Sequence, residues 1–358
     1  MRGNDFNPNW ASMPGDTIAD ILSTKNLTLS EFSRLMNSNQ SEVKQLLHGF
    51  IAINEPIAIK LHKALGGSKD FWLKREEQYR QSVEKLRQTE ESKWIEELPT
   101  SDMIKFGWIK KGSNLIESCL EYFGVPDVWT WRKKYSEVVA MSAFRKSDSF
   151  LSTPGSLATW IRQGEKQAES VDCAPWNPDK FVDCFGDIKK LSKIKEPKKF
   201  IPLLKKICEN SGIALIIAPT PKGCSASGVA KFLSSQKAMI LLSFRYKSDD
   251  HFWFTFFHEA AHLLLHSHKE IFIEFEKNIR EVSKEEKEAN EYSSLVLISA
   301  DLRKDMQTMS IDEKSIKHIA STSGISLGIV VGQLQHLGKI KPSHYNSFKR
   351  RYDLSEIF

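Results

Sequence analysis

The chain has 358 residues and a formal net charge of +6, with 41% hydrophobic and 27% charged residues. This length exceeds what one ordinary hydrophobic core supports, so two or three domains are expected. A charge surplus this small does not by itself indicate nucleic-acid binding. The longest apolar runs, such as residues 213–219, are far shorter than the roughly 20 residues of a membrane span, which excludes a transmembrane protein.

Signals of export are missing from the sequence. Met1–Phe6 is polar and has no apolar segment, so no signal peptide is expected. The five cysteines are odd in number and widely spaced, and no Cys-x-x-Cys pair indicates a zinc knuckle or redox site. We therefore expect reduced thiols in a cytoplasmic protein with no membrane partner.

The first part of the chain predicts a series of short amphipathic helices. A helix starts at Pro14-Gly15, and a longer one is capped by Ser68. Three more helices are predicted between them, at Ser30–Met36, Gln40–Leu47 and Pro56–Leu65. The second and third helices have about two turns each and are joined by the polar turn Asn37-Ser38-Asn39. This is helix-turn-helix geometry.

The middle of the chain is predicted to be helical and shows no catalytic spacing. Its tryptophans are expected to form a core, and residues 171–187, rich in Pro, Asn and Asp, are expected to form a connecting loop. The tryptophans are Trp94, Trp108, Trp129, Trp131 and Trp160. From residue 200 onward the pattern is helix, strand (213–218), Gly/Ser-rich turn (223–228), strand (238–244) and helix. This order predicts an α+β fold that is mostly α-helical, with a small sheet.

The helix after the second strand carries the pattern His258-Glu259-Ala260-Ala261-His262. Ser248 is expected to cap this helix, and its sequence from Phe252 to Leu265 is apolar nearly all round, so it should be buried. His258 and His262 are four residues apart and share a face, so both imidazoles can bind one Zn²⁺ ion. Glu259 is the expected catalytic residue, placed to take a proton from a metal-bound water. The alternative is that the histidines are ordinary hydrogen-bonded core groups.

A zinc site needs a third protein ligand, and the spacing leaves three candidates. His266 lies about 12 Å along the helix axis from His258, too far for the same ion. His268 has the metzincin offset, but Leu265 stands where metzincins have the glycine that turns the chain. Glu286, on an acidic helix over residues 283–298, could be a ligand, with Asn290 one turn later as a supporting hydrogen-bond partner. Ser283 and Glu286 also fit a capping box, in which Glu286 only closes the helix start.

These residues resemble a known family. Phe254–Phe257 followed by His258–His266, and then Glu286–Tyr292, is similar to the ImmA/IrrE family of zinc metallo-endopeptidases. The resemblance implies gluzincin-type coordination of Zn²⁺ with Glu286 as the third metal ligand beside His258 and His262. The chain departs from the family pattern at Ala260-Ala261, often Leu-Gly, and at Ile298-Ser299, often Met-Pro.

The N-terminal residues 13–80 separately resemble HigA-type antitoxins of the Cro/C1 (XRE) helix-turn-helix class. The matching segments are Pro14-Gly15, Leu29–Ser33, Ser41–Gly49 and Asp70–Leu73. The resemblance implies that the third helix is the recognition helix in the DNA major groove. Its outward polar residues are the expected DNA-binding residues: Asn39, Gln40, Ser41, Lys44 and Gln45.

Weaker similarity to long fused members of the peptidase family continues through the middle, including residues 144–147. At the C-terminus, residues 324–335 are expected to form a small helical subdomain whose glycines favour tight packing. We therefore expect three domains: a helix-turn-helix domain at 1–88, a helical linking region at 89–195 and a gluzincin-like metallopeptidase domain at 196–358.

The expected function is a DNA-binding transcriptional regulator whose zinc-dependent endopeptidase domain cleaves a regulatory protein such as a repressor. An oxyanion donor is also required, and Tyr246, His251 and Tyr292 remain open. The strand at 238–243 is the expected edge for an extended substrate. The alternative function is the antitoxin of a toxin–antitoxin pair, which binds operator DNA and a cognate toxin and uses the protease-like domain as a sensor or scaffold. A homodimer is a further expected assembly.

Overall fold

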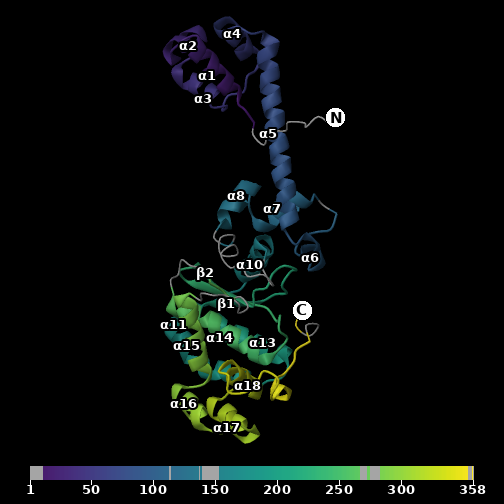
Figure 1. Cartoon of the computed structure of the whole chain (residues 1–358), viewed down its shortest axis with the longest axis vertical. Coiled ribbons are helices and arrows are strands. Elements are labelled where there is room, and N and C mark those ends of the chain that lie inside the picture. Colours follow the sequence, from purple (N-terminus) through teal and green to yellow (C-terminus); the bar gives the residue numbers. More distant parts are fainter. Residues whose placement is uncertain are drawn as a thin grey trace. The chain divides into compact units, whose positions relative to one another are not determined.

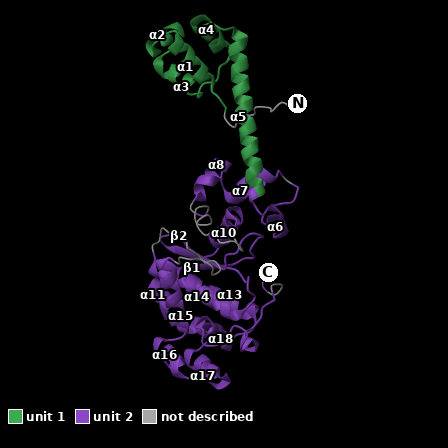
Figure 2. Ribbon diagram, in the orientation of Figure 1, with its two compact units in different colours: residues 1–96 green, residues 97–358 purple. Residues whose placement is uncertain are grey.

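A computed structural model describes residues 11–112, 114–136, 138, 153–266, 272–274, 283–353 and 357. The chain divides into two compact units, Met1–Glu96 and Glu97–Phe358 (Figure 2). The expected boundary at residues 88 and 89 lies inside a continuous helix, α5 (Lys69–Glu97). The expected division into three domains remains a proposal.

The first unit is a bundle of short helices (Figure 1). They are α1 (Pro14–Thr24), α2 (Leu29–Leu35), α3 (Gln40–Leu47) and α4 (Glu55–Leu65), followed by α5. Thr28 caps α2 in a reciprocal capping box with Glu31, as the local sequence favours. Gly15 is required because a Cβ there would lie 1.8 Å from the carbonyl oxygen of Leu47, so α1 and α3 pack backbone to backbone. Its apolar core is separate from that of the second unit.

Helix α5 is mostly polar apart from the buried Trp72 and Trp94, and ion pairs stabilise it along its own length. Arg87 pairs with Glu84 and Glu91 at 2.7 Å, and Arg80 pairs with Glu76 at 2.6 Å, at the i+3 and i+4 spacings that join neighbours on a helix surface. Ser68 caps its start by accepting a hydrogen bond from the Phe71 amide.

The second unit begins with helices that carry three of the five tryptophans that were expected to form a core. They are α6 (Thr100–Lys105), α7 (Leu115–Phe123), α8 (Val128–Lys134) and α10 (Pro154–Glu169). Trp131 and Trp160 are fully buried, as is Trp94 on α5 of the first unit, whereas Trp108 is half-buried. Trp129 is 71% exposed, so its expected place in the core was wrong. The expected loop at 171–187 was also partly wrong, because Pro178 starts α11 (Pro178–Asp183) and α12 (Phe185–Leu191) follows.

A four-stranded sheet lies at the centre of this unit, in the order β1-β3-β2-β4. Strands β1 (Ile213–Ile217) and β3 (Lys237–Leu242) pair in parallel, with Leu215 opposite Ile240. The two other strands, β2 (Gly228–Ser234) and β4 (Phe272–Glu274), pair antiparallel to their neighbours and were not predicted. The central position of β3 also corrects the expected substrate edge, because β3 is paired on both sides.

Helices cover both faces of the sheet. α10 packs on one face, where a Cβ at Gly164 would lie 2.8 Å from Leu241. α13 (Pro197–Glu209) and α14 (Asp249–Leu265) share a core with the opposite face. The remaining helices are α15 (Lys284–Leu297), which packs along α14, then α16 (Ala300–Thr308), α17 (Glu313–Ser323) and α18 (Leu327–His336), with a 3-10 turn at Asn346–Phe348 (Figure 1). The mostly helical α+β fold is therefore confirmed.

Among the helices that the structure describes, none has both the length and the apolar character of a membrane-spanning segment.

Candidate metal centre

Helix α14 is mostly buried, with His251 and Leu265 exposed, and its N-terminal carboxylates are held by the C-terminal part of the chain. Ser248 stands at the N-cap position, but its hydroxyl donates to Asp250 and caps no backbone amide, so the expected capping role was wrong. Asp249 accepts hydrogen bonds from the Ser326 hydroxyl (2.8 Å) and the Arg350 amide (2.9 Å). Burial raises the pKa of the Asp249 carboxyl, and the hydrogen bond from Ser326 partly opposes this rise.

Asp250 is held by an ion pair with Lys349, whose Nζ lies 2.6 Å from its carboxylate. Helix α18 meets this end of α14 through glycines, as the sequence indicated. A Cβ at Gly328 would lie 2.3 Å from the Asp249 carboxylate, and one at Gly332 would lie 2.8 Å from the Asp250 Cβ. The orientation of α14 is therefore fixed at the end away from its histidines.

The two histidines of α14 converge on one point. His258 and His262 are fully buried, and their Nε2 atoms lie 3.0 Å apart. This follows from the four-residue spacing, which stacks the two side chains on one helix face.

Glu286 joins the histidines from helix α15. Its Oε2 lies 3.3 Å from Nε2 of His258, and its Oε1 lies 3.8 Å from Nε2 of His262. Ser283 does cap α15, because its hydroxyl accepts the Glu286 amide at 3.2 Å, but the Glu286 carboxylate does not return to the cap. The capping-box alternative is thus not what the structure shows, since the carboxylate faces the imidazoles.

The three side chains fit a divalent transition-metal ion. One ligand atom from each of His258, His262 and Glu286 can be chosen so that all lie within 4.8 Å of one another. In a tetrahedral zinc site, with bonds of about 2.0–2.1 Å, neighbouring ligand atoms are about 3.3 Å apart. Two imidazoles and one carboxylate are also a donor set that zinc accepts at catalytic sites.

Glu259 lies next to the first histidine on the helix and is fully buried. Its side chain faces strand β2, where Gly228 leaves the space that it occupies. A Cβ at Gly228 would lie 2.3 Å from Oε1 and 2.7 Å from Cγ of Glu259. The unpredicted strand β2 therefore forms one wall of the site, and only a glycine fits at that point.

A further histidine supports the cluster, and sequence reasoning considered it only as a ligand. Nδ1 of His262 lies 2.9 Å from Nδ1 of His266, whose Nε2 lies 3.2 Å from the Glu288 carboxylate. Outer partners of this kind fix the orientation of a metal-binding imidazole. The signal for this contact was present in the sequence, because His262 and His266 are also four residues apart.

The other expected site residues are less close to the cluster. Asn290 is half-buried one turn after Glu286, and no hydrogen bond from its amide to either histidine is found among the described residues. Tyr246 stacks on His251 at the start of α14, and His251 is about 10 Å along the helix from His258. Tyr292 packs half-buried against the apolar core. His268 and residues 144–147 lie outside the described residues.

In the first unit, the expected DNA-binding residues gather on α3. Asn39, Gln40, Ser41, Lys44 and Gln45 are all exposed, whereas Val43 and Leu46 on the opposite face are buried. Asn39 caps the helix, and its side-chain oxygen accepts the Glu42 amide at 2.9 Å. Asn37, in the turn before α3, adopts a positive φ of 48° that asparagine tolerates.

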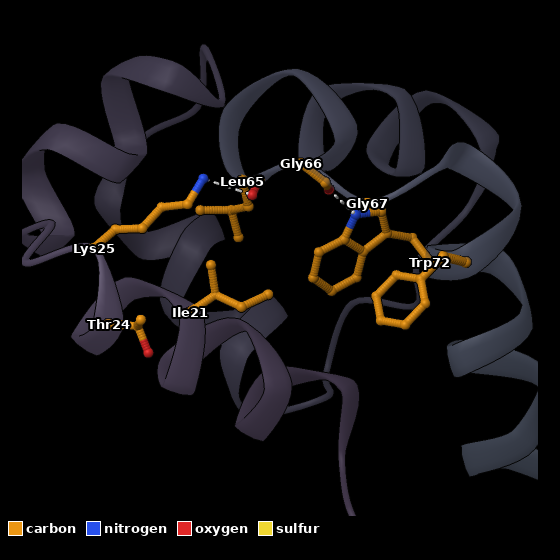
Figure 3. A pocket seen from close by; sticks show the side chains of 8 residues that line it. Ile21, Thr24, Lys25, Leu65, Gly66, Gly67 and Trp72 are labelled. Carbon is orange, nitrogen blue, oxygen red and sulfur yellow. Dashed lines mark hydrogen bonds between the residues drawn. The ribbon is translucent and has the colours of Figure 1, made fainter.

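The first unit also has a mainly apolar hollow of about 390 Å³ between α1 and the α4–α5 turn (Figure 3). Polar groups on its wall are already hydrogen-bonded: Lys25 Nζ donates to the Leu65 carbonyl, and Trp72 Nε1 donates to the Gly66 carbonyl (Figure 3). These bonds join α1, α4 and α5, so the hollow is part of the packing of the bundle.

Residues 208–334, about a third of the chain, match the family model described as the IrrE N-terminal-like domain, Peptidase_M78. This region is similar to IrrE N-terminal-like domains. It contains all three converging side chains, Glu259 and strand β2.

The N-terminal region matches a curated relative, an uncharacterized HTH-type transcriptional regulator, YddM, of Escherichia coli strain K12. The two sequences are 40% identical over 60 residues, which is 17% of this chain and 64% of the relative. The chain thus spans somewhat less than two thirds of that relative. Together, the two matches confirm the resemblance to a helix-turn-helix module joined to an ImmA/IrrE-type domain.

Proposed function

We propose that this protein is a transcriptional regulator with a zinc-dependent endopeptidase domain that cleaves a regulatory protein. The observation that carries the proposal is the convergence of His258, His262 and Glu286 from two helices. Burying two imidazoles beside a carboxylate is costly unless their polar atoms are used. A shared cation is the use that fits the donor atoms and the domain family.

In this proposal, His258, His262 and Glu286 hold Zn²⁺. The ion, when bound, polarises a peptide carbonyl and acidifies a water molecule. Glu259 accepts the proton of that water and then carries it to the leaving amine. The α14–β2 contact keeps the Glu259 carboxylate at the site, and the contact between His262 and His266 orients one ligand.

DNA binding is proposed for α3, with Asn39, Gln40, Ser41, Lys44 and Gln45 facing the major groove. Two observations support it. All five side chains are exposed on α3 while the opposite face of this helix is buried, and the chain is similar to an HTH-type regulator. The double substitution Lys44→Ala and Gln45→Ala should weaken operator binding, and unchanged binding would mean that another helix reads the DNA.

The peptidase proposal is tested by Glu259→Gln, which keeps the size of the side chain and removes its basicity. We expect bound zinc to be unchanged and peptide cleavage to fall at least about a hundredfold, because a positioned general base contributes roughly 10²–10⁴ in rate. Cleavage at the wild-type rate would remove Glu259 from the mechanism. The antitoxin alternative predicts that this variant still regulates its operator normally in cells.

A further inference from the structure

The basic residues of the chain are unevenly distributed. Residues 1–96 contain thirteen basic and thirteen acidic residues, so the first unit has no net charge. Residues 187–209 contain eight lysines and only three acidic residues, which accounts for most of the +6 surplus of the whole chain. The lysines are Lys189, Lys190, Lys193, Lys195, Lys198, Lys199, Lys205 and Lys206. We call the surface that they form the α12–α13 lysine surface.

The fold places these lysines on one side of two helices. The apolar residues of α12 and α13, among them Ile188, Phe200 and Leu204, are buried in the core of the second unit. The opposite side is therefore lined by ammonium groups, and six of the eight lysines are exposed, all except Lys189 and Lys205. This differs from α5, where basic and acidic residues alternate and pair.

Three of the six exposed lysines have an ion-pair partner and three have none among the described residues. Lys190, Lys199 and Lys206 pair with Asp187, Glu196 and Glu209. By contrast, Lys193, Lys195 and Lys198 form no ion pair with any residue in the described part of the chain. Unpaired like charges repel one another, so a surface of this kind is favourable only when counterions or an anionic partner cover it.

The segment that carries these lysines is held in place. Arg350 donates to the carbonyl oxygens of Ser192 (2.8 Å) and Ile194 (3.3 Å), and the Ser326 amide donates to the Ser192 hydroxyl (3.0 Å). The connection between α12 and α13 is thus fixed to the C-terminal part of the chain. A partner meets ammonium groups on an ordered backbone, which lowers the entropy lost on binding.

We infer that the α12–α13 lysine surface is a second DNA-binding surface, which contacts the phosphate backbone without reading sequence. Phosphate contacts by lysine supply most of the non-specific affinity of DNA-binding proteins. Protein–protein interfaces, in contrast, are depleted in lysine and enriched in aromatic anchors. The first unit has no surplus charge, so the α12–α13 lysine surface would add to the electrostatic part of DNA affinity. The inference adds to the contact proposed for α3 and does not depend on peptidase activity.

The test uses the full-length protein carrying Lys44→Ala and Gln45→Ala, so that α3 contributes little. Binding to a DNA duplex without operator sequence is measured by fluorescence anisotropy at several salt concentrations. In this background, the triple variant Lys193→Gln, Lys195→Gln and Lys198→Gln is compared with a control triple, Lys304→Gln, Lys314→Gln and Lys317→Gln. The control residues are exposed on α16 and α17, and residues 300–323, which include both helices, contain four basic and four acidic residues.

We expect the first triple variant to weaken DNA binding and to reduce the slope of log affinity against log salt by about 2–3, since each phosphate contact contributes about 0.9. The control triple should leave the slope unchanged. Equal slopes for the two triples would overturn the inference. The inference would also be overturned if the first triple variant weakened binding to polyglutamate but not to DNA. The surface would then bind an acidic protein. Unchanged thermal unfolding and zinc content show that each variant is folded.

Discussion

At the scale of single residues, the site is defined by which side chains the packing brings to one point. The sequence predicted His258, Glu259 and His262 from their spacing alone. The sequence could not decide whether Glu286 is a metal ligand or part of a helix cap. Its position three residues after Ser283 fits a capping box, and the same position leaves its carboxylate able to bind a metal. The structure separates them, since the backbone amide of Glu286 satisfies the cap while its carboxylate faces the histidines.

Gly228 is the residue that sequence reasoning assigned only to a turn. Its importance is visible only when β2 lies against α14, because the contact is between residues 31 positions apart in sequence. No local sequence pattern indicates that Gly228 and Glu259 lie close together.

Gly228→Ala should therefore affect the peptidase more than the metal. The new methyl group would meet the Glu259 carboxylate at 2.3 Å, so either Glu259 or strand β2 must move. We expect hydrolysis to fall at least about tenfold, since small displacements of a catalytic group are costly, with zinc retained. Gly186→Ala is the matched control, because a Cβ there meets nothing within 4 Å. Full activity of Gly228→Ala would contradict this prediction, because it would show that the Glu259 carboxylate tolerates the added methyl group.

At the scale of elements, helices with clear start signals were predicted well and strands were not. Residues Gln40–Leu47 form α3 as expected, because Asn39 caps it and the positions of its apolar residues repeat with helical period. Strand β2 was missed because Lys231 and Ser234 interrupt its apolar pattern, and its pairing with β3 and β4 is what makes it a strand. The Asn177-Pro178 start of α11 was taken for a loop signal, although asparagine caps and proline at the first turn favour a helix.

The contact between α14 and the C-terminal segment is expected to be a main source of stability for the site. Lys349 and Asp250 form an ion pair whose side chains are only 11% and 7% exposed. Lys349→Ala would leave a buried carboxylate without its cation, and breaking such a pair costs on the order of 3 kcal/mol. Chemical denaturation of the second unit measures this change.

Lys199→Ala is the control for this prediction. Lys199 and Glu196 also form an ion pair, but their side chains are 69% and 55% exposed. Exposed pairs contribute about 0–1 kcal/mol, so this variant should unfold almost like the wild type. Equal destabilisation by the two substitutions would mean that burial of the Asp250 pair has no special effect.

At the scale of the whole molecule, the two units have separate cores. The apolar cluster of the first unit is confined to residues 18–73, and the cluster around α14 uses residues from 176 onward. Length and motif content predicted more than one domain, but the sequence could not fix where the units divide, because α5 continues through the expected boundary.

Separate cores predict that the units unfold separately. A ligand that binds only the native state raises the stability of the unit that binds it. Removing metal with a chelator should therefore lower the midpoint of one calorimetric transition and leave the other, from the first unit, unchanged. A single transition that shifts as a whole would show that the two units unfold together.

The central claim is that one zinc ion is bound by His258, His262 and Glu286. Metal analysis of purified protein, for the wild type and for Glu286→Gln, tests it most directly. The account predicts one equivalent of zinc in the wild type and loss of most of it in the variant, whose amide is a weaker ligand than a carboxylate. Wild-type protein without stoichiometric zinc, or a variant that holds zinc equally tightly, would contradict it.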